Sequence, residues 1–131
     1  MTQPIWLTLE IVQTLHAEAV TRFGGTGGMR DLGLLESALE RPRNLFAYGG
    51  HPSFSELAAA YCAGIVKNHP FVDGNKRAGA LAAAVFLDLN GQVLAPDEAM
   101  LAIKIMDLAA GEIDEVALAA WIEANCDAKP D

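Results

Sequence analysis

The feature that most constrains the fold is a break between two alanine-rich segments in the middle of the chain. Residues 57–67 and 78–89 consist mostly of small and apolar side chains, which is typical of helices that pack closely. Pro70 disfavours α-helical geometry at His69, so the first helix is expected to end there. Gly74 permits a tight turn into the second helix. The sequence therefore predicts two neighbouring helices joined by a short, sharply turned loop.

This loop carries more chemically capable groups than any other part of the chain, in the order His69-Pro70-Phe71-Val72-Asp73-Gly74-Asn75-Lys76-Arg77. The first N–H groups of the following helix have no partner within the helix, and the positive end of the helix dipole also favours an anion. Together with the side chains of Lys76 and Arg77, these donors describe a pocket for phosphate. Asp73 lies at its edge, and a carboxylate beside bound phosphates is a common way for a protein to hold Mg²⁺.

Each of these residues also has a purely structural interpretation. A histidine at a helix end often serves as a cap, and Asp73 with Lys76 or Arg77 could form a solvated ion pair. Phe71 is interpreted as a core anchor that fixes the loop. The combination of a base, an acid, an amide and two cations around one helix N-terminus favours the functional interpretation.

At these residues the chain resembles the Fic/Doc family, whose signature reads approximately H-P-F-x-[D/E]-G-N-[G/K]-R. Every signature position is filled, and residues 28–39 are similar to the early region of the death-on-curing (Doc) branch. The resemblance implies an all-α fold. We expect residues 1–131 to form a single domain, a compact bundle of about six helices with the motif loop between two central helices.

Composition limits the classes of partner and compartment. The formal net charge of −8 and the sequence pI near 4.7 argue against broad binding to nucleic acid or anionic membranes. The chain contains no apolar run of transmembrane length, and its first residues lack the pattern of a signal peptide. Of the two cysteines, Cys62 falls in an apolar helix, which fits a reducing compartment better than a disulfide scaffold. We expect a soluble, cytoplasmic protein with no direct nucleic-acid or membrane partner.

Apolar periodicity and capping residues predict the other helices, at about residues 9–23, 31–40, 96–110 and 113–125. Thr8 is the expected N-cap of the first helix, and a capping box at residues 53–56 starts the helix before the motif. His16 lies one position off the apolar stripe and is interpreted as a structural or surface residue. The helix at residues 78–89 is expected to be the central, buried one. No segment is predicted to be a strand.

Two irregular segments are predicted. Residues 24–28, here called the glycine loop, lack the Gly-Lys-Ser/Thr ending of a P-loop and are interpreted as a linker or mobile flap. Pro42 should stop the helix before it, which makes residues 41–52 the longest irregular stretch, with a small hairpin possible. In the Fic/Doc resemblance this stretch matches a flap over the active site. Arg41 and Arg43 could therefore contact phosphate or target, or simply be solvated.

The groups in the motif suit phosphoryl or nucleotidyl transfer, in which catalysis is mostly positioning and charge neutralisation. We expect ATP and Mg²⁺ as cofactors, with His69 taking the proton from a target hydroxyl and Asp73 holding Mg²⁺. The phosphates are expected to be bound by the backbone and side chains that begin the second helix, which are Gly74, Asn75, Lys76 and Arg77.

The transferred group depends on how the triphosphate lies. Fic-type members of the family usually have Gly in place of Lys76 and a second Arg where this chain has Ala80, and they transfer AMP. The lysine is the variant of the Doc branch, and there the resemblance implies γ-phosphate transfer to a threonine of elongation factor Tu. The expected function is thus a protein kinase toxin of a type II toxin–antitoxin system. The alternatives are AMP transfer to a protein hydroxyl, and a non-catalytic nucleotide-binding module, which would not need His69.

The resemblance also implies a restraining partner. Many Fic-type enzymes contain an inhibitory helix with the pattern [S/T]-x-x-x-E-[G/N], and the nearest match, residues 14–19, fails at Ala19. We therefore expect a separate Phd-like antitoxin, encoded in the same operon, that folds a helix into an apolar groove of this chain. The glycine loop and residues 41–52 are the expected rim of that groove.

Overall fold

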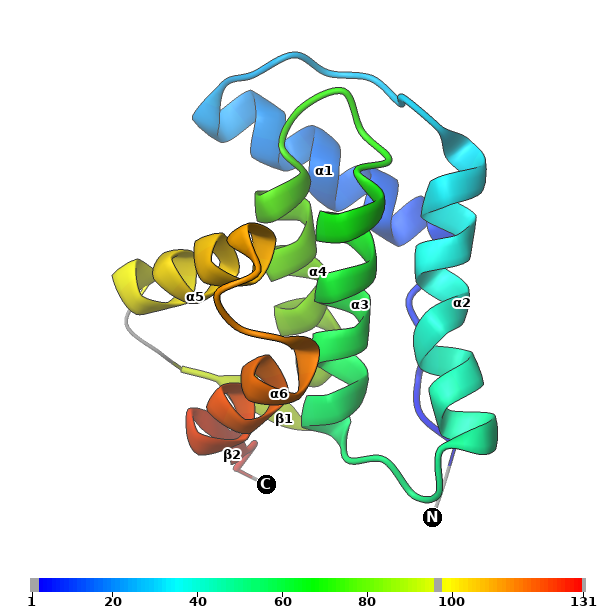
Figure 1. Ribbon diagram of the computed structural model, residues 1–131, viewed down its shortest axis with the longest axis vertical. Helices are drawn as coiled ribbons and strands as arrows, with labels where there is room; N and C mark the ends of the chain where they lie inside the picture. The colour runs from blue at the N-terminus through cyan, green and yellow to red at the C-terminus, as the bar shows by residue number, and fades with distance from the viewer. Residues whose placement is uncertain (1–2, 96–97, 131) are drawn as a thin grey trace.

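The computed structural model describes residues 3–95 and 98–130, which form six α-helices and one small sheet (Figure 1). In chain order the elements are α1 (Leu9–Phe23), α2 (Leu32–Tyr48), α3 (Phe54–Asn68), α4 (Asn75–Leu89), β1 (Gln92–Leu94), α5 (Glu98–Ala110), α6 (Glu115–Ala124) and β2 (Cys126–Ala128). The predicted all-α bundle is confirmed, and the motif loop joins α3 to α4. No helix in the described part of the chain is both long and apolar enough to cross a bilayer.

Helix α3 lies at the centre, with α2 and α4 on either side and α5 and α6 against it (Figure 1). Eleven of its 15 residues are buried. The prediction that α4 is the central helix is wrong, because one side of α4 faces a cleft, described below. Small residues set the spacing of these helices. A Cβ added at Gly64 would lie 3.2 Å from the Cα of Ala38 in α2, and one at Gly79 would lie 3.0 Å from Val66 Cγ2 in α3.

The predicted helix starts are confirmed where they depend on local side-chain chemistry. The side chains of Thr8 and Asp31 each accept a hydrogen bond from a backbone N–H in the first turn of the helix that follows. Ser53 and Glu56 form the reciprocal pair of a capping box at the start of α3. The start predicted for the next helix, at residues 96–98, falls partly on Pro96 and Asp97, which lie outside the described residues.

The prediction that the second helix ends before Pro42 is wrong, because α2 continues through this residue to Tyr48. A proline inside a helix loses one backbone hydrogen bond and clashes with the preceding turn. Here the proline ring is itself buried, and the continuation packs Leu45 and Phe46 against the core. The ring of Phe46 meets Trp6 edge-on, with 5.6 Å between ring centroids. Tertiary burial thus outweighs the local preference.

Residues 41–52 are therefore neither an irregular flap nor a hairpin. They form the end of α2 and the turn into α3, at the opposite end of the bundle from the motif loop (Figure 1). The guanidinium of Arg41 pairs with the carboxylate of Glu115 at 2.7 Å. That of Arg43 lies over the ring of Trp6, 5.5 Å from its centroid. Both arginines thus contact other parts of the bundle and do not line the predicted phosphate pocket.

The small sheet was not predicted. Strands β1 and β2 pair antiparallel, with Val93 opposite Asp127. Strands this short carry no readable alternation, and their pairing joins segments separated by two helices.

Cys62 is a buried core residue, as predicted, and both cysteines are free. Burial, with a smaller effect from the charge of Glu115, raises the pKa of the Cys62 thiol to about 12. The thiol is therefore neutral in the core.

Candidate functional site

The motif loop turns at two residues with positive φ. His69 caps the C-terminus of α3 with φ 53° and ψ 55°, and Gly74 caps the N-terminus of α4 with φ 78°. The predicted helix end at His69 and the predicted glycine turn are thus confirmed. For a residue with a Cβ, the left-handed region costs about 1–2 kcal/mol. The conformation of His69 must therefore be held by its surroundings.

Arg30 supplies that support. Its Nε–H donates to the carbonyl of His69 at 2.7 Å, and its Nη2–H donates to the carbonyl of Asn68 at 2.9 Å. Its own backbone N–H and that of Asp31 both donate to the carbonyl of Pro70. A cation at a helix C-terminus also interacts favourably with the negative end of the dipole. Arg30 thus holds the backbone on both sides of the imidazole, a role that the sequence did not predict.

The glycine loop lies beside the motif loop (Figure 1). The N–H of Val72 donates to the carbonyl of Gly28 at 3.1 Å, and the N–H of Thr26 lies 3.3 Å from Asp73 Oδ2. A Cβ at Gly25, where φ is 110°, would lie only 2.8 Å from that same carboxylate oxygen. The positive φ favours glycine at position 25, and a side chain there would also displace the Asp73 carboxylate. The segment beside the motif loop is therefore this one rather than residues 41–52.

Phe71 and Asn75 form the buried underside of the motif loop. The ring of Phe71 is 1% exposed, which confirms its interpretation as a core anchor. The side-chain carbonyl of Asn75 accepts from the N–H of Phe71, and its NH₂ group donates to the carbonyl of Phe71, both at 3.0 Å. Both polar groups of the Asn75 side chain thus tie the loop, and its backbone N–H is the group that remains for an anion.

His16 also lies against the motif loop. Its ring stacks on Phe71 with 3.7 Å between centroids and 5° between planes, and its Nε2 lies 2.7 Å from the carbonyl oxygen of Asp73. The sequence interpretation as a structural or surface residue missed this contact. Its only signal was a histidine beside, but not on, the apolar stripe of α1.

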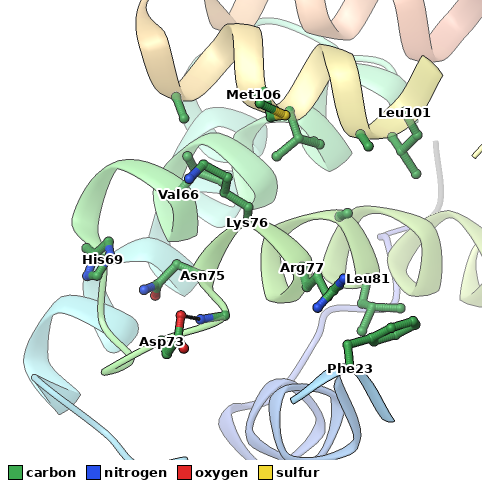
Figure 2. A pocket seen from close by; sticks show the side chains of 15 residues that line it. Phe23, Val66, His69, Asp73, Asn75, Lys76, Arg77, Leu81, Leu101 and Met106 are labelled. Carbon is green, nitrogen blue, oxygen red and sulfur yellow. Dashed lines mark hydrogen bonds between the residues drawn. The ribbon is translucent and has the colours of Figure 1, made fainter. Parts of the chain in front are cut away.

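The outer side of the motif loop opens into a cleft of about 690 Å³ between α4 and α5 (Figure 2). All six predicted site residues line it, namely His69, Asp73, Gly74, Asn75, Lys76 and Arg77. The rest of the wall is apolar and comprises Phe23, Val66, Ala80, Leu81, Leu101, Ala102, Ile105, Met106 and Ala109. A concave site of this size, with a few converging polar groups on an apolar wall, is typical of small-molecule binding.

The polar end of the cleft is suited to an anion. The first hydrogen bond of α4 runs from the N–H of Ala78 to the carbonyl of Gly74, so the helix offers no acceptor to the N–H groups of residues 75–77. Lys76 and Arg77 are exposed beside them. The guanidinium of Arg77 lies 4.0 Å from the centroid of the Phe23 ring, at the end of α1. This contact keeps a cationic side chain at the cleft.

The donor set restricts which metal the site could hold. No three His, Cys, Asp or Glu side chains cluster as metal ligands within residues 3–95 and 98–130. A structural or catalytic Zn²⁺ needs three or four protein ligands and does not fit. Mg²⁺ keeps several waters and takes further ligands from phosphates, so the single carboxylate of Asp73 beside an anion site does fit it.

An all-α bundle in which a histidine, a carboxylate and a helix start with free N–H groups surround one loop defines a class of protein. The Fic/DOC family model matches residues 6–87, and the chain belongs to this family. The chain is 42% identical over 76 residues to Toxin Doc of Mycolicibacterium smegmatis, covering 57% of this chain and 58% of that protein. It is 35% identical over 99 residues to Protein kinase doc of Escherichia phage P1, covering 76% of this chain and 78% of that protein. The resemblance stated from the motif is thus confirmed.

Substitutions at two positions of the motif loop should differ in their effect on stability, because Phe71 anchors the loop in the core and Asp73 lines the cleft. Phe71→Ala should lower the free energy of unfolding by about 3–5 kcal/mol, because it leaves a cavity under the loop. Asp73→Asn should change it by less than about 1 kcal/mol, because the side chain is exposed and the amide oxygen can still accept from Gly74. Urea unfolding followed by circular dichroism measures both.

Val72→Ala is the matched control, since Val72 is in the same loop and 47% exposed. A stable Phe71→Ala variant together with an unfolded Asp73→Asn variant would reverse the two assignments.

Proposed function

We propose that this protein is the toxin of a type II toxin–antitoxin system and transfers the γ-phosphate of ATP to a hydroxyl of a translation factor. A factor similar to elongation factor Tu is the proposed target, and its modification would block translation. The observation that carries the proposal is that one cleft contains His69, Asp73 and the free N–H groups that begin α4. Two relatives are named as a Doc toxin and as a protein kinase, which supports the same class.

In the proposed reaction His69 is the general base. Its side chain is exposed at the cleft, so a hydroxyl on another protein can approach it from solvent. The hydroxyl oxygen attacks the γ-phosphorus while its proton passes to the imidazole. The bond between the γ-phosphorus and the β–γ bridging oxygen breaks, and ADP leaves.

The start of α4 holds the phosphates in this proposal. The N–H groups of residues 75–77 and the side chains of Lys76 and Arg77 bind their oxygens, where they stabilise the charge that spreads in the transition state. When bound at Asp73, Mg²⁺ neutralises part of the phosphate charge. The apolar wall takes the less polar part of the nucleotide.

Two residues support γ-phosphate rather than AMP transfer. Lys76 lines the cleft in place of the glycine usual in Fic-type members, where it occupies space and adds charge suited to a terminal phosphate. Ala80 lines the same cleft at the position of the second Fic-type arginine, so no cation is provided there. AMP transfer remains the alternative that the experiment below must separate.

The proposed restraint is a separate, Phd-like antitoxin. The near match to an inhibitory motif at residues 14–19 lies in α1, and its Glu18 is exposed and does not line the cleft. Beside the cleft, α5 exposes Met100, Ile103 and Met106, which are 42%, 48% and 60% exposed. An amphipathic helix that covers such side chains is a common mode of binding. We propose that α5 and the glycine loop form the rim of this groove, because residues 41–52 lie at the opposite end of the bundle from the motif loop.

Transfer should carry label from the γ position of ATP and not from the α position. The protein is incubated with Mg²⁺, candidate translation factors and ATP labelled separately at each position, and the modified factor is weighed by mass spectrometry. A phosphate adduct is the expected result. An AMP adduct from the unaltered chain would overturn the proposed reaction in favour of adenylylation.

His69→Ala should lower transfer by at least about 100-fold while ATP–Mg²⁺ binding persists, because a base is needed only for the reaction. His51→Ala is the matched control, since His51 is also exposed and also has φ 53°, but lies at the other end of the bundle. Lys76→Gly should weaken γ-phosphate transfer. Full transfer by His69→Ala would show that His69 is not the general base.

Expression of the chain alone in its native host should stop growth, because Glu18, the glutamate of the near match to an inhibitory motif, does not line the cleft. Co-expression of the neighbouring open reading frame should restore growth, and His69→Ala should be harmless at the same protein level. Unimpaired growth with the folded, unaltered chain would contradict the toxin proposal.

A further inference from the structure

The residue that the proposed reaction leaves unused is His16, in the middle of α1. It is 4% exposed, whereas His51 and His69 are both exposed. A polar side chain is buried only at a cost unless it is paired. The partners of the buried His16 side chain therefore indicate what this residue does.

The His16 ring contacts the motif loop. The ring stacks on Phe71, and Nε2 lies 2.7 Å from the carbonyl oxygen of Asp73. A Cβ added at Gly74 would lie 3.4 Å from Nε2, so the backbone of the turn also rests on the ring. A carbonyl oxygen only accepts, so Nε2 carries the hydrogen and His16 is the donor.

This hydrogen bond fixes the orientation of the peptide group between Asp73 and Gly74. The carbonyl of Asp73 points to α1, while Oδ1 accepts from the N–H of Gly74 at 2.9 Å. Asp73 O is also the acceptor that an earlier start of α4 would give to the N–H of Arg77, four residues on. Because His16 orients this carbonyl toward α1, the carbonyl does not accept from the N–H of Arg77, which stays free for the cleft.

We infer that His16 is a positioning residue for the metal-binding carboxylate. Its Nε2–H holds the Asp73 peptide so that the carboxylate points into the cleft and the N–H groups of α4 stay free. The inference rests on the proposed function for its link to Mg²⁺, but the hydrogen bond itself can be tested without it.

Two substitutions separate the donor from the ring. His16→Phe keeps a flat ring to stack on Phe71 and removes the donor. His16→Gln removes the ring and places an amide NH₂ close to the position of Nε2. Thermal melts of both variants show whether each is folded, so that loss of structure is measured separately from loss of positioning.

The first measurement is amide hydrogen exchange, without nucleotide or metal, of the hydrogen-bonded N–H groups in and beside the turn, which are those of Val72, Gly74 and Ala78. Exchange should be roughly 5- to 10-fold faster in folded His16→Phe than in the unaltered chain, the effect of one hydrogen bond, and close to normal in His16→Gln. Unchanged exchange in His16→Phe would overturn the inference whether or not the chain transfers phosphate.

The second measurement is the Mg²⁺ dependence of transfer at fixed ATP. His16→Phe should raise the Mg²⁺ concentration for half-maximal rate by roughly 5- to 10-fold, with most of the rate recovered at saturating Mg²⁺, and His16→Gln should restore the normal requirement. A loss of rate that follows melting temperature in both variants, with no change in Mg²⁺ requirement, would reduce His16 to a packing residue. No transfer by the unaltered chain would contradict the proposed function, and hydrogen exchange would still decide the role of His16.

Discussion

The site depends on where the carbonyl oxygens of the motif loop go. A phosphate is attracted by N–H groups and repelled by carbonyl oxygens, so an anion pocket made of backbone needs the two kinds of group on different sides. Here Arg30 donates hydrogen bonds to the carbonyls of residues 68–70. The side chain of Asn75 donates to the carbonyl of Phe71, and His16 donates to that of Asp73. The N–H groups that begin α4 are left toward the cleft. Separating donors from acceptors in this way is what turns a tight turn into a candidate binding site.

The packing of the helices keeps these hydrogen-bond partners in place around the motif loop. Close packing of α3 against α2 and α4, which Gly64 and Gly79 allow, sets the two ends of the motif loop at a fixed distance. α1 contacts α4 and brings His16 under the loop. The segment that precedes α2 brings Arg30 to the end of α3. The left-handed backbone of His69 is stable only in this setting, and its imidazole is thereby presented to solvent.

The sequence predicted the features that depend on neighbouring residues and missed the contacts between residues far apart in the chain. The motif residues are contiguous, so their gathering at one helix start followed from Pro70 and Gly74 alone. The helix caps at Thr8, Asp31 and Ser53 were predictable for the same reason, because each acts within one turn. Their partners in the fold could not be predicted in this way.

His16 lies 57 residues from Asp73, and Arg30 lies 39 residues from His69, so neither contact leaves a periodic signal. The same reason explains the missed sheet and the helix that continues through Pro42, where packing on Trp6 decided the outcome. The measurement that tests the central claim most directly is a crystal structure with Mg²⁺ and a non-hydrolysable ATP analogue. The claim predicts the γ-phosphate on the N–H groups of residues 75–77, with an Asp73 oxygen about 2.1 Å from the metal. An α-phosphate in that place, or a nucleotide bound outside the cleft, would contradict it.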